Sequence, residues 1–171
     1  MTLEMNFARV IAAPVEEVFA AFTAPAGQVA FYGQDDRGWI VRSQCDLRVG
    51  GAWTVAFGPS PTELYRHHHV FEAIEPPHRL LLATTEIRLD GTSFTSTIEF
   101  TFEDQNGDTL MTMVQTGFPT KELRDEHRRG VPNAFTRLER HLARSRPDWV
   151  RDRSGAYRGR ARLPGRPSAV R

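Results

Sequence analysis

The most conspicuous chemical feature of the sequence is a run of three histidines, His67-His68-His69. The surrounding stretch is typical of a β-strand, in which successive side chains point to opposite faces, so His67 and His69 share one face. Two imidazoles on one face could bind zinc or copper, but such a site needs a third ligand and usually a fourth. The single cysteine and the remaining histidines show no ligand spacing: Cys45, His78, His127 and His141. We therefore expect no metal ion and no other cofactor.

A second group of residues could move protons. Several polar side chains fall in phase with apolar neighbours on predicted strands: His67, His69, Thr84, Glu86 and Gln115. Burying such groups costs free energy unless they pair with each other, with water or with a ligand. His67, His69 and Glu86 are the candidate catalytic residues, and a buried Glu86 near His69 could be a general base with a shifted pKa. The position of Glu86 near a strand end favours the alternative, in which its carboxylate lies in solvent.

Other kinds of site are not indicated. The chain has no G-x-S-x-G motif, and no predicted histidine lies beside Cys45 to activate it. It also lacks a G-x-G-x-x-G motif after a strand and a Walker-type loop, so nucleotide cofactors are disfavoured. The sequence leaves open whether the protein is an enzyme.

The elements that must position these residues are mostly strands. Period-two alternation predicts a first strand over Leu3–Ala12, and three- and four-residue spacing predicts a short helix over 14–23. A second short helix is expected over Pro25–Tyr32. Strand candidates follow at Trp39–Gln44, Ala52–Gly58, Leu64–Ile74, Arg79–Leu89, and on both sides of the hairpin signal Asn106-Gly107. The pattern predicts an antiparallel meander of about six strands, with the first strand pairing at an edge.

The C-terminal part changes character. Residues 120–129 are charged and helix-prone with little apolar surface, and Pro132 starts a second stretch in which Phe135, Leu138 and Leu142 form a stripe. Residues 132–144 are the best-supported helix. A sheet with one apolar face must be covered, and a sheet curved around one helix readily leaves a cavity for a small apolar molecule. The fold class is therefore α+β.

Charge divides the chain of 171 residues into two parts. Residues 144–171 hold nine Arg and two Asp, a net charge of +7, whereas residues 1–143 have a net charge of −6. We expect one domain over 1–143 and a flexible, Arg-rich tail over 144–171. Such a tail could touch anionic surfaces, but Arg mixed with Gly and Pro does not indicate a nucleic-acid partner. A single cysteine, no evident signal peptide and no membrane span predict a cytoplasmic protein.

Five short segments carry a family resemblance: RVIAAP at 9–14, EVFAAFT at 17–23, DLRVGGAW at 46–53, IEPPHRL at 74–80 and QTGF at 115–118. Together they resemble the START-like (SRPBCC, Bet v 1-like) superfamily, and most closely its activator of Hsp90 ATPase (AHSA1-like) branch. Residues Gly130–Leu142 fall where that family has its long helix. The chain departs from the family pattern at Phe31-Tyr32, where tryptophan is usual, at Gln115, where His or Thr is common, and in its Arg-rich tail.

The resemblance implies the helix-grip fold: a curved antiparallel sheet of six to seven strands around a long C-terminal helix, with short helices after the first strand. It also implies a ligand cavity between sheet and helix and makes a homodimer plausible. The residues expected to bind the ligand are Trp53, Val55, Tyr65, His67, His69, Phe71, Leu82, Thr84, Phe94, Ile98, Phe100, Met111, Met113, Gln115, Phe118, Phe135 and Leu138.

Three functions remain open. The first is binding of a small hydrophobic or aromatic molecule without catalysis. The second is an enzyme resembling polyketide cyclases or aromatases, which requires that His67, His69 and Glu86 converge in one pocket. The third, a chaperone-interacting role, is the weakest, because the sequence lacks the separate N-terminal domain of the eukaryotic co-chaperone.

Overall fold

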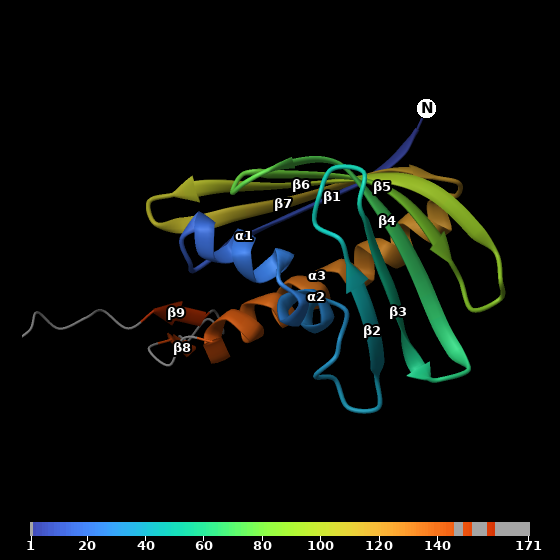
Figure 1. Ribbon diagram of the computed structural model, residues 1–171, viewed down its shortest axis with the longest axis horizontal. Coiled ribbons are helices and arrows are strands. Elements are labelled where there is room, and N and C mark those ends of the chain that lie inside the picture. The colour runs from blue at the N-terminus through green and yellow to red at the C-terminus, as the bar shows by residue number, and fades with distance from the viewer. Residues whose placement is uncertain (1, 146–148, 152–156, 160–171) are drawn as a thin grey trace, which may run out of the picture.

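Seven strands form one antiparallel sheet, in the order β1-β7-β6-β5-β4-β3-β2, in the computed structural model (Figure 1). The structure describes residues 2–145, 149–151 and 157–159. The strands of the sheet are β1 (Leu3–Ile11), β2 (Ile40–Cys45), β3 (Ala52–Ser60), β4 (Glu63–Glu75), β5 (Arg79–Ile87), β6 (Ser93–Gln105) and β7 (Asp108–Phe118). The helices are α1 (Val15–Thr23), α2 (Pro25–Phe31) and α3 (Lys121–Ser145). The predicted helix-grip fold is confirmed, with the first strand paired at the sheet edge.

Alternation of side chains fixes which face of the sheet is buried. In β5, alternate residues are buried and their neighbours are half-buried or exposed, so one face of the strand packs inward. The β6–β7 hairpin turns at Asn106 and Gly107, whose φ angles of 56° and 94° match a two-residue turn with both residues in the left-handed region. The predicted hairpin is therefore present, and it sets the register that aligns Gln115 with Ile98.

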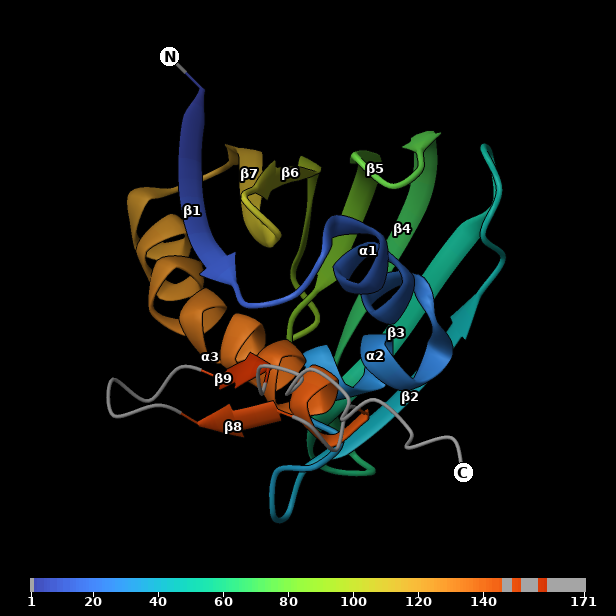
Figure 2. The same cartoon turned by 90° about the vertical axis from the view of Figure 1, so that its left-hand side faces the viewer.

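All three helices lie on the same side of the curved sheet (Figure 2). Helix α1 follows Pro14, places Glu16 and Glu17 in its first turn, and buries a stripe of Val15, Val18, Phe19 and Phe22. Carboxylates near a helix N-terminus interact favourably with the helix dipole, and the apolar stripe faces the core. Helices α1 and α2 thus cover part of the sheet, and α3 crosses the rest.

Helix α3 corrects one prediction. Two separate helical stretches were expected over 120–129 and 132–144, but the structure has one helix of 25 residues with Pro132 inside it. Proline removes one intrahelical hydrogen bond, to the carbonyl four residues earlier. That earlier residue, Arg128, is exposed, so water can satisfy its carbonyl. Because the helix is continuous, Leu123 and His127 of its first half lie on the same inward face as the apolar stripe.

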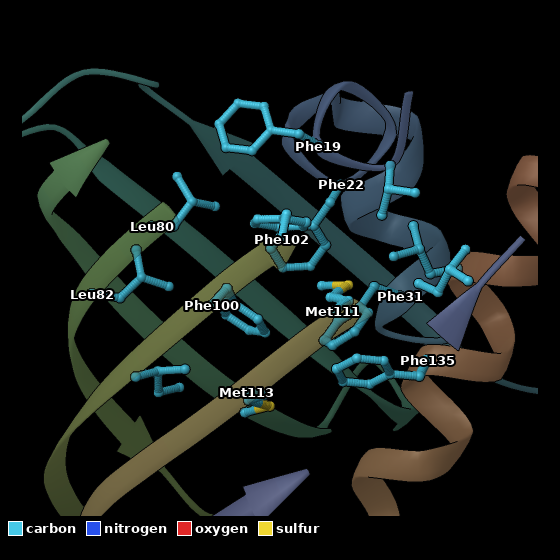
Figure 3. Close-up of a cluster of buried hydrophobic side chains, with 14 of the residues drawn as sticks. Phe19, Phe22, Phe31, Leu80, Leu82, Phe100, Phe102, Met111, Met113 and Phe135 are labelled. Carbon is cyan, nitrogen blue, oxygen red and sulfur yellow. The ribbon is translucent and has the colours of Figure 1, made fainter. Parts of the chain in front are cut away.

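The core lies between the concave face of the sheet and the helices (Figure 3). Phe22 of α1 packs against three aromatic rings at centroid distances of 4.7 to 5.8 Å, namely Phe31, Trp53 and Phe100. Phe135 of α3 contacts Phe7 of β1 at 4.7 Å. Such edge-to-face and tilted ring contacts add to the free energy gained by burying apolar surface.

The predicted tail contains some regular structure. Two short strands, β8 (Trp149–Arg151) and β9 (Tyr157–Gly159), pair with each other in an antiparallel two-stranded sheet. Composition alone did not indicate these strands. The rest of the predicted tail beyond Ser145 lies outside the described residues, and the domain boundary after residue 143 stays a prediction. None of the described helices combines the length and the apolar composition that a membrane crossing requires.

Thr109 supports the fold through one buried hydrogen bond. Its Oγ1 donates to the carbonyl of Ala13, which precedes α1, over 2.6 Å, and its side chain is fully buried. Thr109→Val keeps the shape but leaves that carbonyl without this donor. We expect the free energy of unfolding to fall by about 1–3 kcal/mol in urea titration. Thr112→Val, at a half-buried position on the other face of β7, is the control and should change it by less than about 0.5 kcal/mol.

Candidate functional site

A cavity of about 320 Å³ lies between the sheet and helix α3. It is lined by Phe31, Tyr32, Trp53, Phe57, Tyr65, His67, His69, Glu86, Ile87, Arg88, Ile98, Phe100, Met113, Gln115, Glu126, His127, Gly130, Val131, Asn133, Ala134 and Arg137. The most exposed of these are Ile87, Glu126, Gly130 and Asn133. The mouth of the cavity therefore lies between the end of β5 and the first half of α3.

The sequence-predicted residues divide into two sets. Those that line the cavity are Trp53, Tyr65, His67, His69, Glu86, Ile98, Phe100, Met113 and Gln115. Those that do not line it are Val55, Phe71, Leu82, Thr84, Phe94, Met111, Phe118, Phe135 and Leu138. All of the second set are buried except Phe94, which is half-buried between Phe118 and His127. The alternation of apolar residues along the strands identified which side chains point inward. Many inward-pointing side chains pack in the core and do not line the cavity.

His67 and His69 are joined by a tyrosine. The hydroxyl of Tyr32 lies 3.1 Å from Nδ1 of His67 and 3.0 Å from Nε2 of His69. The other nitrogen of His69, Nδ1, is 2.8 Å from Oγ1 of Thr84, the residue opposite it on β5. The register thus places His67 opposite Glu86 and His69 opposite Thr84, and the tyrosine completes a chain of hydrogen bonds.

Glu86 is the centre of the polar residues. Its Oε2 lies 3.3 Å from Nε2 of His67 and 2.7 Å from Nε2 of His127, and its Oε1 accepts a hydrogen bond of 2.7 Å from Nε2 of Gln115. Gln115 also donates to Oγ of Ser96 on the intervening strand β6. We call Tyr32, His67, His69, Glu86, Gln115 and His127 the polar cluster.

The expectation that Glu86 lies in solvent is wrong. Glu86 is 4% exposed, although it is the second-last residue of β5. Helix α3 covers this strand end and brings His127 onto the carboxylate, and a carboxylate can be buried when several donors satisfy it. The Glu86 carboxylate contacts His67, whereas the sequence indicated a position near His69. The three catalytic candidates nevertheless converge, directly or through Tyr32.

Geometry fixes the protonation of His127. Its Nδ1 lies 2.9 Å from the carbonyl of Leu123, which can only accept, and its Nε2 faces the Glu86 carboxylate. Both ring nitrogens therefore donate, and the ring is an imidazolium paired with a carboxylate. Burial opposes the charge of His127, but the hydrogen bond and the negative charge of Glu86 raise its pKa above the ordinary value.

Three further members of the polar cluster, Tyr32, His69 and Glu86, have pKa values shifted away from neutrality. Burial alone would raise the pKa of Glu86, but the neighbouring His67 and His127 hold it well below its ordinary value. Burial and the nearby His67 lower the pKa of His69 to about 3. Burial, together with the negative charge of Glu86, raises the pKa of Tyr32 well above its ordinary value. At neutral pH, Glu86 is thus ionised, His69 is neutral and Tyr32 keeps its proton.

Tyr32 owes its position to the turn that ends α2. Gly33 has a φ angle of 102°, and a Cβ at this position would lie 2.8 Å from the Trp39 ring, so glycine is required. The Trp39 indole donates to the carbonyl of Tyr32 over 3.0 Å, and Arg137 of α3 binds Asp36 in the same loop. This framework holds the tyrosine hydroxyl between the two histidines.

Sequence reasoning missed Tyr32 and His127. The signal for His127 is present: Leu123, His127, Val131, Ala134 and Leu138 recur at four- and three-residue spacing on one helix face. Splitting the helix at Pro132 concealed this pattern. No comparable signal marks Tyr32, because a loop places it beside strand β4 and its contact residues are 35 and 37 positions away.

Metal binding is not indicated by this arrangement. Among the residues that the structure describes, no group of three or more His, Cys, Asp or Glu is arranged to hold a metal ion. The nitrogens of His67 and His127 that face Glu86 act as hydrogen-bond donors to the carboxylate, so they do not offer lone pairs to a cation. The absence of a metal or other cofactor stays a prediction.

A comparison with protein-family models shows which family the chain belongs to. The profile described as "Activator of Hsp90 ATPase homolog 1-like protein" matches residues 12–143. The chain belongs to this AHSA1-like family. The family match confirms the predicted resemblance to the AHSA1-like branch of the START-like superfamily.

Solved structures agree with the AHSA1-like fold. A protein from Rhizobium leguminosarum is 19% identical, with a TM-score of 0.73, over 84% of this chain and 96% of that one. Protein Ms6760 from Mycobacterium smegmatis is 22% identical, with a TM-score of 0.65, over 82% and 88% of the two chains. An AHSA1-like protein from Aeromonas hydrophila is 17% identical, with a TM-score of 0.67, over 84% and 94%. At these identities the likeness shows the fold alone. Comparison with curated proteins found no significant match.

The charge on His127 predicts how the stability of this AHSA1-like protein depends on alkaline pH. A folded pKa raised above the unfolded value contributes stability that is complete below about pH 6.5 and is lost as pH rises through the folded pKa. Glu86 stays ionised throughout this range and adds no slope. We therefore expect the free energy of unfolding in urea to decline between about pH 6.5 and about pH 8.5, below the range in which Cys45 and Tyr32 titrate.

His127→Gln should remove most of this decline, and the exposed His68, replaced by Gln, is the control that should keep it. An unchanged alkaline slope in His127→Gln would show that the imidazolium pair is not its source.

Proposed function

We propose that this protein binds a small hydrophobic or aromatic molecule in the cavity between the sheet and α3. The observation that carries the proposal is the lining: aromatic and aliphatic side chains surround a volume at the lower end of the range usual for small-molecule sites. A few buried polar groups stand at one wall, which is the usual means of fixing a ligand's orientation. Trp53, Phe100 and Met113 offer flat and adaptable apolar contacts beside that wall.

A thermal-shift panel tests the proposal. The probes are saturated fatty acids of 8 to about 16 carbons, which cover the range of chain volumes that such a cavity could take, flavonoid polyphenols and two-ring phenols such as 2-naphthol. A ligand present at about 100 times its Kd stabilises the native state by about 2.7 kcal/mol, which raises the Tm by several degrees. No stabilisation by any member of the panel would overturn the proposal.

Proton-transfer catalysis, as in cyclase- or aromatase-like enzymes, is the second candidate. The observation in its favour is the convergence of His67 and Glu86, with His69 joined through Tyr32. The pKa directions argue against it, because an efficient general acid or base has a pKa near the working pH. Glu86 and His69 are weak bases at neutral pH, and Tyr32 is a weak acid.

Deuterium exchange at the α-carbons of 2-tetralone, followed by proton NMR, would test this candidate. Catalysis predicts exchange in the presence of the wild-type protein that is at least about 100-fold faster than with His67→Gln. Equal rates for both proteins would discard it.

Two further proposals rest on the sequence and the family. A cytoplasmic location follows from the lone Cys45, and a homodimer follows from the family resemblance. The family's printed description refers to activation of the Hsp90 ATPase. No feature of the described residues favours chaperone binding, so we do not propose that role.

A further inference from the structure

The polar cluster has a fixed supply of hydrogen-bond donors. If His67 is neutral, its Nε2–H donates to Glu86, the Tyr32 hydroxyl donates to Nδ1 of His67, and Nε2–H of His69 donates to the Tyr32 oxygen. Thr84 then donates to Nδ1 of His69. Every proton in this chain is used within the protein.

The protonated form of His67 leads to the same conclusion about free donors. If His67 is protonated, its Nδ1–H donates to the Tyr32 oxygen, the Tyr32 hydroxyl donates to Nε2 of His69, and Nδ1–H of His69 donates to Thr84. The only donor left without an acceptor in this network is the hydroxyl of Thr84, which does not line the cavity. Either way, Tyr32, His67 and His69 offer no free donor to a ligand.

The remaining members of the polar cluster are also without a free donor. His127 donates from both nitrogens, to Leu123 and to Glu86. The two N–H groups of the Gln115 amide go to Glu86 and to Ser96. In the opposite orientation the amide oxygen would lie 2.7 Å from Oε1 of the ionised Glu86 carboxylate, and the two oxygens would repel each other, so the amide nitrogen faces Glu86.

What remains unused in the polar cluster is acceptor capacity. Oε1 of Gln115 is buried and has no hydrogen-bond partner among the described residues, and Gln115 itself is 0% exposed. A buried acceptor without a donor costs free energy, so Oε1 of Gln115 destabilises the protein unless a bound group donates a hydrogen bond to it. Gln115 lines the cavity. Donors that line the cavity elsewhere belong to other residues: Tyr65, Arg88, Asn133 and Arg137.

We propose that the ligand presents a hydrogen-bond donor, a hydroxyl or N–H group, to the polar cluster, with Oε1 of Gln115 as its acceptor. This inference rests on the proposed function and narrows its ligand class. An aromatic body fits among Trp53, Phe100 and Met113, and its donor reaches the wall formed by the polar cluster. Molecules that present only an acceptor or an apolar edge to the polar cluster leave Oε1 of Gln115 without a donor, and they should therefore bind more weakly.

Three naphthalenes of similar size separate donor recognition from simple apolar binding. They are 2-naphthol, which has a donor, 2-methoxynaphthalene, which has only an acceptor, and 2-methylnaphthalene, which has neither. Equilibrium dialysis at pH 7 measures the three Kd values. We expect 2-naphthol to bind about 10- to 100-fold more tightly than either analogue, although the analogues are more hydrophobic.

Gln115→Met tests the position of the acceptor. This variant should bind the two analogues about as well as the wild type does, and it should lose the preference for 2-naphthol. Equal Kd values for all three compounds in the wild type, or a preference that survives in a folded Gln115→Met variant, would overturn this inference and leave the proposed function standing. No binding of any of the three up to their solubility limits would count against both.

Discussion

Glu86→Ala is expected to lower the free energy of unfolding by about 3 kcal/mol at pH 7. The substitution leaves three buried or half-buried donors without their acceptor, on His67, Gln115 and His127. It also leaves the His127 imidazolium without its counter-charge, and removing one partner of a buried ion pair is among the most costly single changes in a protein core. Urea titration measures the loss.

Glu72→Ala is the matched control, because Glu72 is an exposed glutamate on β4, and its replacement should cost less than about 0.5 kcal/mol. An NMR titration adds a signature that general destabilisation does not produce: the pKa of His127 should fall in Glu86→Ala, since the Glu86 carboxylate is what raises it. A loss below about 1 kcal/mol with an unchanged His127 pKa would contradict the assigned pairing.

Ala134→Trp is expected to weaken binding of 2-naphthol by at least about 100-fold, which corresponds to about 2.7 kcal/mol. Ala134 lies on the half-buried face of α3 that lines the cavity, so an indole attached there occupies the space of the ligand. The helix should persist, because the new ring enters a cavity rather than a packed core, and the cost in stability should stay within about 1–3 kcal/mol.

Ala134→Ser is the control, since it keeps the volume and should bind 2-naphthol nearly as the wild type does. Circular dichroism checks that Ala134→Trp is folded. Retention of wild-type affinity by folded Ala134→Trp would place the ligand somewhere other than this cavity.

Much of the fold could be predicted from local pattern. Alternation in β5 and β6, the Asn106-Gly107 turn and the apolar stripe of α1 each reflect a short-range rule, and each is confirmed. The sequence also indicated that His67 and His69 share the inward face of a strand. These features depend on neighbours within a few residues, which a single sequence displays directly.

The parts of the site that could not be predicted depend on contacts distant in the sequence. The burial of Glu86 depends on α3, whose His127 is 41 residues away, and nothing near Glu86 signals that covering helix. Pro132 suggested a helix boundary that tertiary packing overrides. Tyr32 lies at the end of a seven-residue helix, where the Gly33 turn and Arg137 decide its direction.

The most direct test of the cavity as a ligand site is a crystal structure of the protein grown with 2-naphthol at a concentration that saturates binding in solution. We predict the ring system among Trp53, Phe100 and Met113, with its hydroxyl within hydrogen-bond distance of Oε1 of Gln115. An empty cavity under those conditions, or 2-naphthol bound only on the outer surface, would contradict this account.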